Sequence, residues 1–252
     1  MTLLSVENLT VRRGECPVVD AASFTIGAGE CVGLIGPNGA GKTSLLRGAL
    51  GLLPFEGAST LAALPARKRA AQAAWLPQTR EIAWPMTVER IVALGRLPYL
   101  ARGASLSPTD QSAVDAALTR MGLQSYRTRL ATALSGGEQA RVLIARTLAQ
   151  DTPLLMADEP IAGLDPAAQI ATLQVFETLA QEGRAVLTSL HDLSLAGRYC
   201  SRLILMGAGR IIADGTPDQI LTADRLKEVF HLKANIVPTP HGPLVQPLGV
   251  IQ

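Results

Sequence analysis

A glycine-rich stretch near the N-terminus carries the residue types that bind the phosphates of a nucleotide. It reads Gly36-Pro37-Asn38-Gly39-Ala40-Gly41-Lys42-Thr43 and is followed by Ser44. Loops of this pattern turn backbone N–H groups toward phosphate oxygens, and the helix that starts after them adds the positive end of its dipole. Lys42 would reach the β- and γ-phosphates, and the Thr43 hydroxyl could ligate Mg²⁺. The alternative is a glycine-rich turn that binds no ligand.

Two consecutive carboxylates, Asp158 and Glu159, follow the apolar run at residues 154–157. Open parallel sheets bind ligands beyond the carboxyl ends of their strands. Asp158 would bind Mg²⁺ there, and Glu159 would orient or deprotonate the water that attacks a phosphate. By itself the pair is equally well explained as an acidic turn after a core strand, but the glycine-rich loop favours the catalytic interpretation.

A third segment, Leu134-Ser135-Gly136-Gly137-Glu138-Gln139, places two glycines at the start of a helical pattern. Such a helix start can bind an anion. The same residues form a capping box, with Ser135 followed three residues later by Glu138, and taken alone this is the simpler interpretation.

The segments around these motifs alternate between strand and helix patterns. Strands are predicted at residues 4–9, 18–26, 31–35, 154–157, 185–190, 203–206 and 210–213, and helices from residue 42 and over 169–179. Residues 85–152 are helical in pattern, with a helix start at Ser107-Pro108 and a second helix over 138–150. The apolar faces of these two helices comprise Val114, Ala117, Leu118, Met121, Val142, Ala145 and Ala149. The pattern predicts a parallel-sheet α/β core with a helical insert.

Composition excludes several classes of protein. The 252 residues are 48% hydrophobic and carry a net charge of +2, which argues against a nucleic-acid binder that relies on bulk charge. Cys16, Cys31 and Cys200 are far apart, which excludes a disulfide framework and fits a reducing compartment. We expect no signal peptide, because no basic segment precedes an apolar run at the N-terminus, and we expect no membrane-spanning helix.

The motifs in their order along the chain resemble the ATP-binding subunits of ABC transporters. The resemblance covers about residues 4–230 and is carried by the glycine-rich loop, Gln78, residues 134–139, Asp158-Glu159, Ala162-Gly163-Leu164-Asp165 and His191. It implies an ATPase with ATP and Mg²⁺ as cofactors. The fold that it implies is an α/β P-loop NTPase (RecA-like) core with an N-terminal antiparallel β region and an inserted α-helical subdomain.

The resemblance also implies a role for each of these residues. Glu159, His191 and Gln78 would be catalytic, with His191 at the γ-phosphate and Gln78 at Mg²⁺ and the water, relaying the nucleotide state toward a membrane partner. Thr43, Gln78 and Asp158 would hold Mg²⁺. The alternatives are a polar loop residue for Gln78 and a structural histidine for His191.

In this family, the segment at residues 134–139 closes over ATP that is bound to another subunit. The residues implied to bind ATP in trans are Ser135, Gly136, Gly137, Glu138 and Asp165. The chain has one phosphate-binding loop and one such segment, which predicts a head-to-tail homodimer with two ATP molecules sandwiched in it. Asp165 is also explained as a helix cap before Pro166.

One position departs from the family pattern. Its members usually stack an aromatic residue near the first turn on adenine, and residues 10–14 contain none. Arg13 is the best positional match for ATP binding, because a guanidinium plane can stack on a base. A solvated charge explains Arg13 equally well, since exposed stacking of this kind is worth only about 0.5–1 kcal/mol.

Residues 93–98 and 191–199, the Leu221-Thr222 turn and Val229-Phe230 resemble the ATPases of importers for iron–siderophore complexes, haem and cobalamin. The implied protein is the motor subunit of a bacterial importer, peripheral on the cytoplasmic face of the inner (plasma) membrane. Its partners would be a second copy, integral-membrane permease subunits and, indirectly, a periplasmic substrate-binding protein, with no nucleic acid. Residues 79–100 would help form the groove for a permease helix; Trp84, Met86, Leu97 and Tyr99 would line this groove or pack in the core.

These assignments divide the chain into four parts. Residues 1–84 are expected to form the first part of the nucleotide-binding core, 85–152 the helical subdomain, 153–232 the second part of the core, and 233–252 a proline-rich tail. Alternative functions are a soluble ABC ATPase of iron–sulfur cofactor assembly and an ABC exporter subunit. A non-hydrolysing adaptor is disfavoured because Glu159 and His191 are both present.

Overall fold

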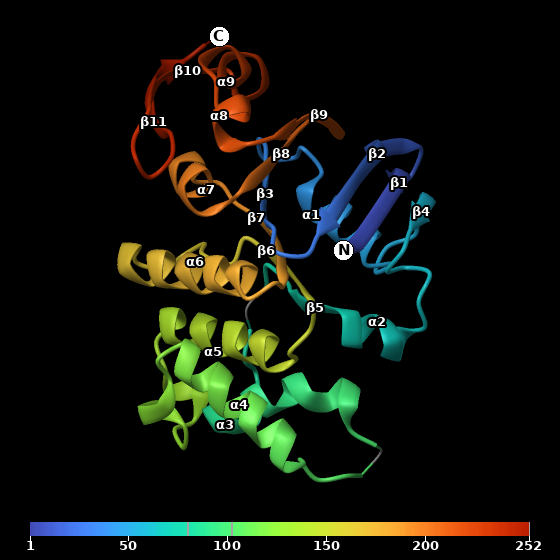
Figure 1. Ribbon diagram of the computed structural model, residues 1–252, viewed down its shortest axis with the longest axis vertical. Helices are drawn as coiled ribbons and strands as arrows, with labels where there is room; N and C mark the ends of the chain where they lie inside the picture. The colour runs from blue at the N-terminus through green and yellow to red at the C-terminus, as the bar shows by residue number, and fades with distance from the viewer. Residues whose placement is uncertain (80, 102, 252) are drawn as a thin grey trace.

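The computed structural model describes residues 1–79, 81–101 and 103–251. Its centre is a six-stranded sheet in the order β5-β6-β7-β3-β8-β9, whose neighbouring strands are parallel except for the β8–β9 pair (Figure 1). The strands are β3 (Cys31–Ile35), β5 (Ala73–Leu76), β6 (Leu154–Asp158), β7 (Ala185–Ser189), β8 (Arg202–Gly207) and β9 (Arg210–Gly215). Every residue of β3, β6 and β7 is buried, as expected for apolar parallel strands that are covered on both faces. The predicted core strands and the hairpin are confirmed.

A smaller antiparallel sheet of β1 (Thr2–Arg13), β2 (Cys16–Gly27) and β4 (Glu56–Ser59) has the order β2-β1-β4. Both long strands extend beyond their predicted ranges, because the polar residues at their ends also pair: Arg13 lies opposite Cys16. This sheet and α1 (Lys42–Ala49) share one apolar cluster with residues of the central strands, including Leu9, Leu45 and Met156. The predicted N-terminal antiparallel region is therefore confirmed, and so is the helix that starts at Lys42.

The helical region contains α3 (Val88–Ala93), the 3-10 helix η1 (Leu94–Tyr99), α4 (Pro108–Arg120) and α5 (Gly136–Ala149), and it lies at one end of the molecule in Figure 1. α4 begins with the predicted capping box of Ser107 and Asp110. α5 begins two residues before its predicted start at Glu138, because Ser135 caps it and also forms a box with Glu138. The predicted apolar faces of both helices are buried.

The remaining helices are α2 (Ala66–Gln72), α6 (Pro166–Gln181), α7 (Leu193–Tyr199), α8 (Pro217–Ile220) and α9 (Ala223–Phe230). α6 contains the helix predicted over 169–179, and its Leu173 and Phe176 belong to the apolar cluster that joins the sheet to the helical region. Among the described residues, no helix is long and apolar enough to cross a membrane. The proline-rich tail contains a hairpin of β10 (Leu232–Val237) and β11 (Leu244–Val250), which the sequence patterns did not predict.

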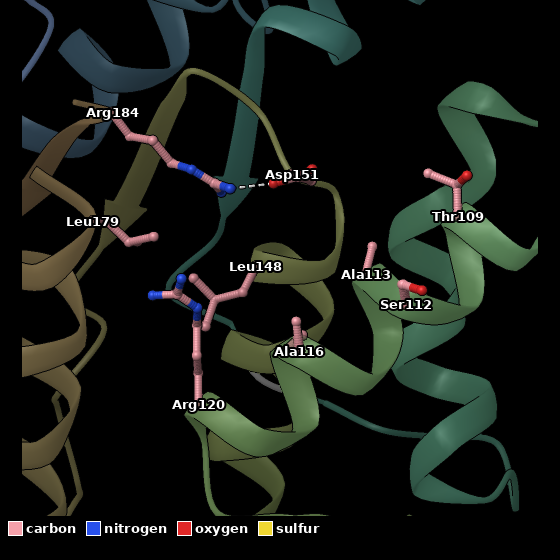
Figure 2. A pocket seen from close by; sticks show the side chains of 10 residues that line it. Thr109, Ser112, Ala113, Ala116, Arg120, Leu148, Asp151, Leu179 and Arg184 are labelled. Carbon is pink, nitrogen blue, oxygen red and sulfur yellow. Dashed lines mark hydrogen bonds and ion pairs between the residues drawn. The ribbon is translucent and has the colours of Figure 1, made fainter. Parts of the chain in front are cut away.

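A hollow of about 270 Å³ between the helical region and the core is lined by residues of two ion pairs, of which Figure 2 shows Arg184–Asp151. Arg120, at the end of α4, contacts both carboxylate oxygens of Glu182 at 2.7 and 2.9 Å. Arg184, just before β7, pairs with Asp151, just after α5. The charged groups are about one-third to one-half exposed, so each pair contributes little to the free energy of unfolding and mainly restricts orientation.

Arg96 joins three elements of the helical region. Its guanidinium Nε lies 2.8 Å from Asp110 Oδ1 at the start of α4, and both side chains are only 8% exposed. Its Nη1 donates to the carbonyl oxygens of Ala149 and Gln150 at the end of α5, at 2.9 and 3.3 Å. The Tyr99 ring lies 4.1 Å from the guanidinium carbon. η1, α4 and α5 are therefore tied together by one buried cation.

Replacing Arg96 should strongly destabilise the protein. Arg96→Met removes the ionic partner of Asp110 and the bonds to the Ala149 and Gln150 carbonyl oxygens, so the free energy of unfolding should fall by clearly more than in an exposed control. The matched control is Arg210→Met, because Arg210 also pairs with an aspartate, Asp20 at 2.6 Å, but is 69% exposed. Urea unfolding at pH 7 should show a change of about 0–1 kcal/mol for the control. Equal changes for the two variants would contradict the role of Arg96.

The same ion pair predicts a dependence on pH. Hydrogen bonds from Ser107 and then from Arg96 lower the pKa of Asp110 from 3.8 to about 2. A lowered folded-state pKa stabilises the fold above the unfolded-state pKa, and this stabilisation is lost as the pH falls toward the folded-state value. The unfolding free energy of the wild type should therefore exceed that of Asp110→Asn by more at pH 5 than at pH 3. A constant difference in urea titrations at the two pH values would refute this.

Candidate functional site

The glycine-rich loop connects β3 to α1 and can be made only with glycine at two of its positions. Gly41 has φ +96°, and a Cβ there would lie 2.4 Å from the carbonyl oxygen of Val18. Gly36 has φ +152°, and its Cβ would lie 2.4 Å from the carbonyl oxygen of Met206. The loop is thus pressed against β2 and β8 at the carboxyl edge of the sheet, and its backbone cannot accept a side chain at either point.

Lys42 is buried at the first position of α1, with 6% of its surface exposed. Its Nζ donates to the carbonyl oxygens of Gly36 at 2.7 Å and Pro37 at 3.0 Å. Burial lowers the pKa of Lys42 from its usual value, and the nearby charges of Glu159 and Asp158 oppose that shift. A buried cation beside a row of backbone N–H groups is suited to bind a phosphate, whose charge would stabilise the ammonium form.

The other two predicted catalytic residues, Gln78 and His191, both contact the Glu159 carboxylate. Gln78, which follows β5, donates from Nε2 to Glu159 Oε2 at 2.9 Å, and the Nε2 of His191, which follows β7, lies 2.6 Å from Glu159 Oε1. Glu159 itself has a positive φ of 50°, which is unusual for a residue with a side chain. Its backbone N–H donates to the Ser189 hydroxyl at 2.8 Å, which holds this strained residue at the end of β6.

Asp158 is almost fully buried, and its two carboxylate oxygens differ. Oδ1 accepts a hydrogen bond of 2.6 Å from the Ser189 hydroxyl, whereas Oδ2 has no hydrogen-bond partner among the described residues. A buried carboxylate oxygen without a partner is costly unless something else binds it. Ser189 thus holds the Asp158 carboxylate and the Glu159 backbone, and sequence reasoning missed it because it is the last residue of an apolar strand with no motif of its own.

A hollow of about 190 Å³ lies beside the glycine-rich loop. Its lining comprises Arg13, Val18, Asn38, Gly39, Ala40, Gly41, Lys42, Thr43, Ser44 and Glu159. Most of the residues predicted to bind ATP are therefore gathered in one place, and Arg13 comes to the same rim from the end of β1. The proposed stacking of Arg13 on a base stays a prediction.

The residues predicted to act in trans lie around a different hollow. Ser135, Gly137, Glu138 and Asp165 line a space of about 620 Å³ that none of the glycine-rich-loop residues lines. The Glu138 N–H donates to the Ser135 hydroxyl at 3.4 Å and the Ser135 N–H donates to Glu138 Oε2 at 2.8 Å, so the capping box forms. Asp165 caps α6 by accepting from the Ala168 N–H at 2.9 Å, as the alternative interpretation of Asp165 predicted. The two groups of candidate residues are thus on separate surfaces of the chain.

The apolar side chains predicted for a permease contact divide into two kinds. Trp84 is 75% exposed and Leu97 is 59% exposed. Met86 and Tyr99 are half-buried: Met86 packs against the apolar cluster of the helical region, and Tyr99 lies against Arg96. An exposed tryptophan and leucine can contact a partner, whereas Met86 and Tyr99 mainly complete the core.

Comparisons with known proteins agree with this arrangement. The sequence profile of the family described as ABC transporter matches residues 19–162. The chain is 41% identical over 249 residues to the hemin import ATP-binding protein HmuV of Pseudomonas fluorescens, covering 94% of this chain and 96% of that one. It is 39% identical over 244 residues to the cobalamin import ATP-binding protein BtuD of Halobacterium salinarum, covering 94% of this chain but only 61% of that longer protein.

A solved structure has the same fold. It is a dimeric ATP-binding cassette in a post-hydrolysis state bound to ADP and phosphate, and it superimposes with a TM-score of 0.74 at 25% identity. The match covers 85% of this chain and 98% of that one. The similarity therefore includes the sheet and the helical region that carry the two hollows.

Proposed function

This chain belongs to the ABC transporter family of ATP-binding proteins, and from that premise we propose that it is the ATP-hydrolysing motor subunit of a bacterial importer. The cargo would be an iron complex, such as a siderophore or haem, or cobalamin. Support for this cargo class comes from the hemin-import and cobalamin-import names of its relatives. The cargo binds elsewhere in such a transporter, so its identity is a property of the partners.

The observation that carries the proposal is the position of the Glu159 carboxylate. It lies between Gln78 and His191, at 2.9 and 2.6 Å, on the rim of the hollow that the glycine-rich loop lines. A carboxylate held in this way can orient a water molecule toward a bound γ-phosphate and accept its proton. His191 would contact the γ-phosphate, and Lys42 would bind the β- and γ-phosphates.

The donor set at the site fits Mg²⁺ as the ion that accompanies ATP. The buried Oδ2 of Asp158, which has no hydrogen-bond partner in the described part of the chain, and the hydroxyl of Thr43 are oxygen ligands of the kind that Mg²⁺ prefers. Gln78 would add its amide oxygen, because its Nε2 already donates to Glu159. The ion would neutralise charge on the phosphates when bound.

A head-to-tail homodimer would complete each site. Ser135, Gly136, Gly137, Glu138 and Asp165 lie away from the chain's own glycine-rich loop, so we assign them to ATP bound by a second copy. Each dimer would then enclose two ATP molecules between a loop of one chain and the 134–139 segment of the other. ATP would close the dimer, because its phosphates would contact charged groups and N–H donors of both copies.

The partners would include permease subunits in the inner membrane, with this chain peripheral on the cytoplasmic face. The exposed Trp84 and Leu97 flank α3 and provide the apolar contact for a permease helix. Gln78 precedes this segment and contacts Glu159, so the segment is connected to the state of the nucleotide site. A periplasmic substrate-binding protein would deliver the cargo to the permease.

Glu159→Gln should retain ATP binding and lose turnover. The amide cannot accept the proton of the attacking water, and loss of a general base lowers kcat by about 10²–10⁴-fold. Without hydrolysis the ATP-closed dimer should accumulate, which sedimentation with Mg-ATP would detect. Glu228→Gln, on the exposed side of α9, is the matched control and should behave as wild type. Hydrolysis by Glu159→Gln at the wild-type rate would exclude Glu159 as the catalytic carboxylate.

A pull-down from the native host tests the transport role. Tagged Glu159→Gln with ATP should recover a multi-span permease from solubilised membranes. Adding Leu97→Glu should reduce that recovery several-fold, because a charge then replaces an apolar contact. Adding Leu52→Glu, which changes an exposed leucine (46%) outside the 79–100 segment, should leave it intact. Recovery of soluble assembly proteins alone would assign the same ATPase chemistry to cofactor assembly instead.

A further inference from the structure

We propose that the C-terminal hairpin β10–β11 positions His191 for ATP hydrolysis by holding α7, and that Ser194 and Gly242 are the positioning residues. This inference rests on the proposed function, because it concerns the histidine at the nucleotide site. It assigns a role to the tail at residues 233–252, for which neither the motifs nor the relatives' names give one.

The first contact is a pair of hydrogen bonds to one side chain. Ser194 lies in the first turn of α7, three residues after His191. Its hydroxyl oxygen accepts a hydrogen bond from the backbone N–H of Val245 at 3.0 Å and also lies 3.3 Å from the Val245 carbonyl oxygen, to which it donates. The Val245 side chain is 8% exposed and belongs to the same apolar cluster as Leu190 and Ala196. β11 is thereby attached to the start of α7.

The second contact is a close approach of two backbones. Gly242 has φ +102°, and a Cβ there would lie 2.5 Å from the carbonyl oxygen of Gly197 in α7. A Cβ on Gly197 would in turn lie 3.1 Å from the Pro243 carbonyl oxygen and 2.9 Å from the Leu221 side chain, which follows α8. α7 is therefore enclosed between the hairpin turn and the end of α8, with no room for a methyl group on either glycine.

The hairpin turn is itself internally bonded, so it can act as a fixed support. The Thr239 hydroxyl donates to the Gly242 carbonyl oxygen at 2.7 Å and accepts from the His241 N–H at 3.1 Å. Figure 1 shows this end of the hairpin beside α7. Side-chain bonds of this kind restrict the turn to one backbone conformation.

Movement of α7 is transmitted to His191 through a short connection. Asp192 caps α7 by accepting from the Leu195 N–H at 2.8 Å, and His191 directly precedes this cap. The His191 side chain is 43% exposed, so the surrounding core does not by itself hold the imidazole. Its Nε2 lies 2.6 Å from Glu159, and a shift of about 1 Å would take that contact beyond hydrogen-bond distance.

The test combines a spectroscopic and a kinetic measurement on the full chain. The chain has three histidines, so imidazole resonances of isotope-labelled protein are few, and His191→Gln identifies the one that belongs to His191. Ser194→Ala removes the hydrogen bonds, and Gly242→Ala pushes the turn away from Gly197. Gly249→Ala is the matched control, because it lies in β11 and a Cβ there meets nothing within 4 Å.

The expected result is a changed His191 resonance in Ser194→Ala and Gly242→Ala and not in Gly249→Ala, in protein without nucleotide. The two variants should also lose about tenfold in kcat, as for a misplaced catalytic group, with the KM for ATP within about twofold of wild type. A variant that only lost folded protein would keep the native His191 resonance in the remaining folded fraction.

Two results would overturn the proposal. An unchanged His191 resonance in both variants would show that the hairpin does not position the imidazole, whether or not the chain hydrolyses ATP. A changed resonance with unchanged kcat would show that the hairpin's hold on His191 is irrelevant to hydrolysis. Failure of the proposed function is distinguishable from both, because the wild type itself would then not hydrolyse ATP.

Discussion

Parallel pairing of four buried strands is the constraint on which the site depends. In a parallel sheet the carboxyl ends of neighbouring strands meet at one edge. Here Leu76 lies opposite Ala157, Asp158 opposite Ser189, and Ser189 opposite Leu34. The residues that follow these strands are Gln78, Glu159, His191 and the glycine-rich loop. Gly36 and His191 are 155 positions apart in the sequence, so these segments converge only because the registers match. A one-residue slip of β6 would turn Asp158 to the opposite face of the sheet.

Three residues of the candidate site are held in states that are energetically unfavourable in the chain alone. Glu159 has a strained backbone, Asp158 has a buried oxygen without a partner among the described residues, and Lys42 is a cation whose burial lowers its pKa. Each of these states costs free energy in the chain alone. Under the proposed function, a triphosphate with its cation would offset two of them at once, by neutralising Lys42 and by supplying a partner for Asp158. Binding would therefore be coupled to the relief of buried charge, which is a reason for the nucleotide to influence the conformation of the protein.

Sequence patterns predicted the features that depend on near neighbours. The buried strands β3, β6 and β7 are apolar runs, and the capping boxes at Ser107 and Ser135 are local spacings, so both were found from the sequence. Ser189 and the Arg96–Asp110 pair were not found from the sequence, because the partners lie apart in the sequence and only the fold brings them into contact. The hairpin β10–β11 was missed because its prolines argue against a strand. Pro247 is tolerated there because β11 pairs with β10 alone in the described sheet.

Charged groups fix the helical region, which carries the 134–139 segment away from the glycine-rich loop of the same chain. Arg96 fixes η1 to α4 and α5, and the pairs Arg120–Glu182 and Arg184–Asp151 link that unit to the core. The start of α5 then faces a hollow that is separate from the one beside the glycine-rich loop. The contacts of Arg96 are buried, whereas the Arg120–Glu182 and Arg184–Asp151 pairs are partly exposed and weak. Arg96 thereby fixes α5, whose start carries the 134–139 segment, within the helical region, and the apolar cluster that includes Leu173 and Phe176 joins that region to the core.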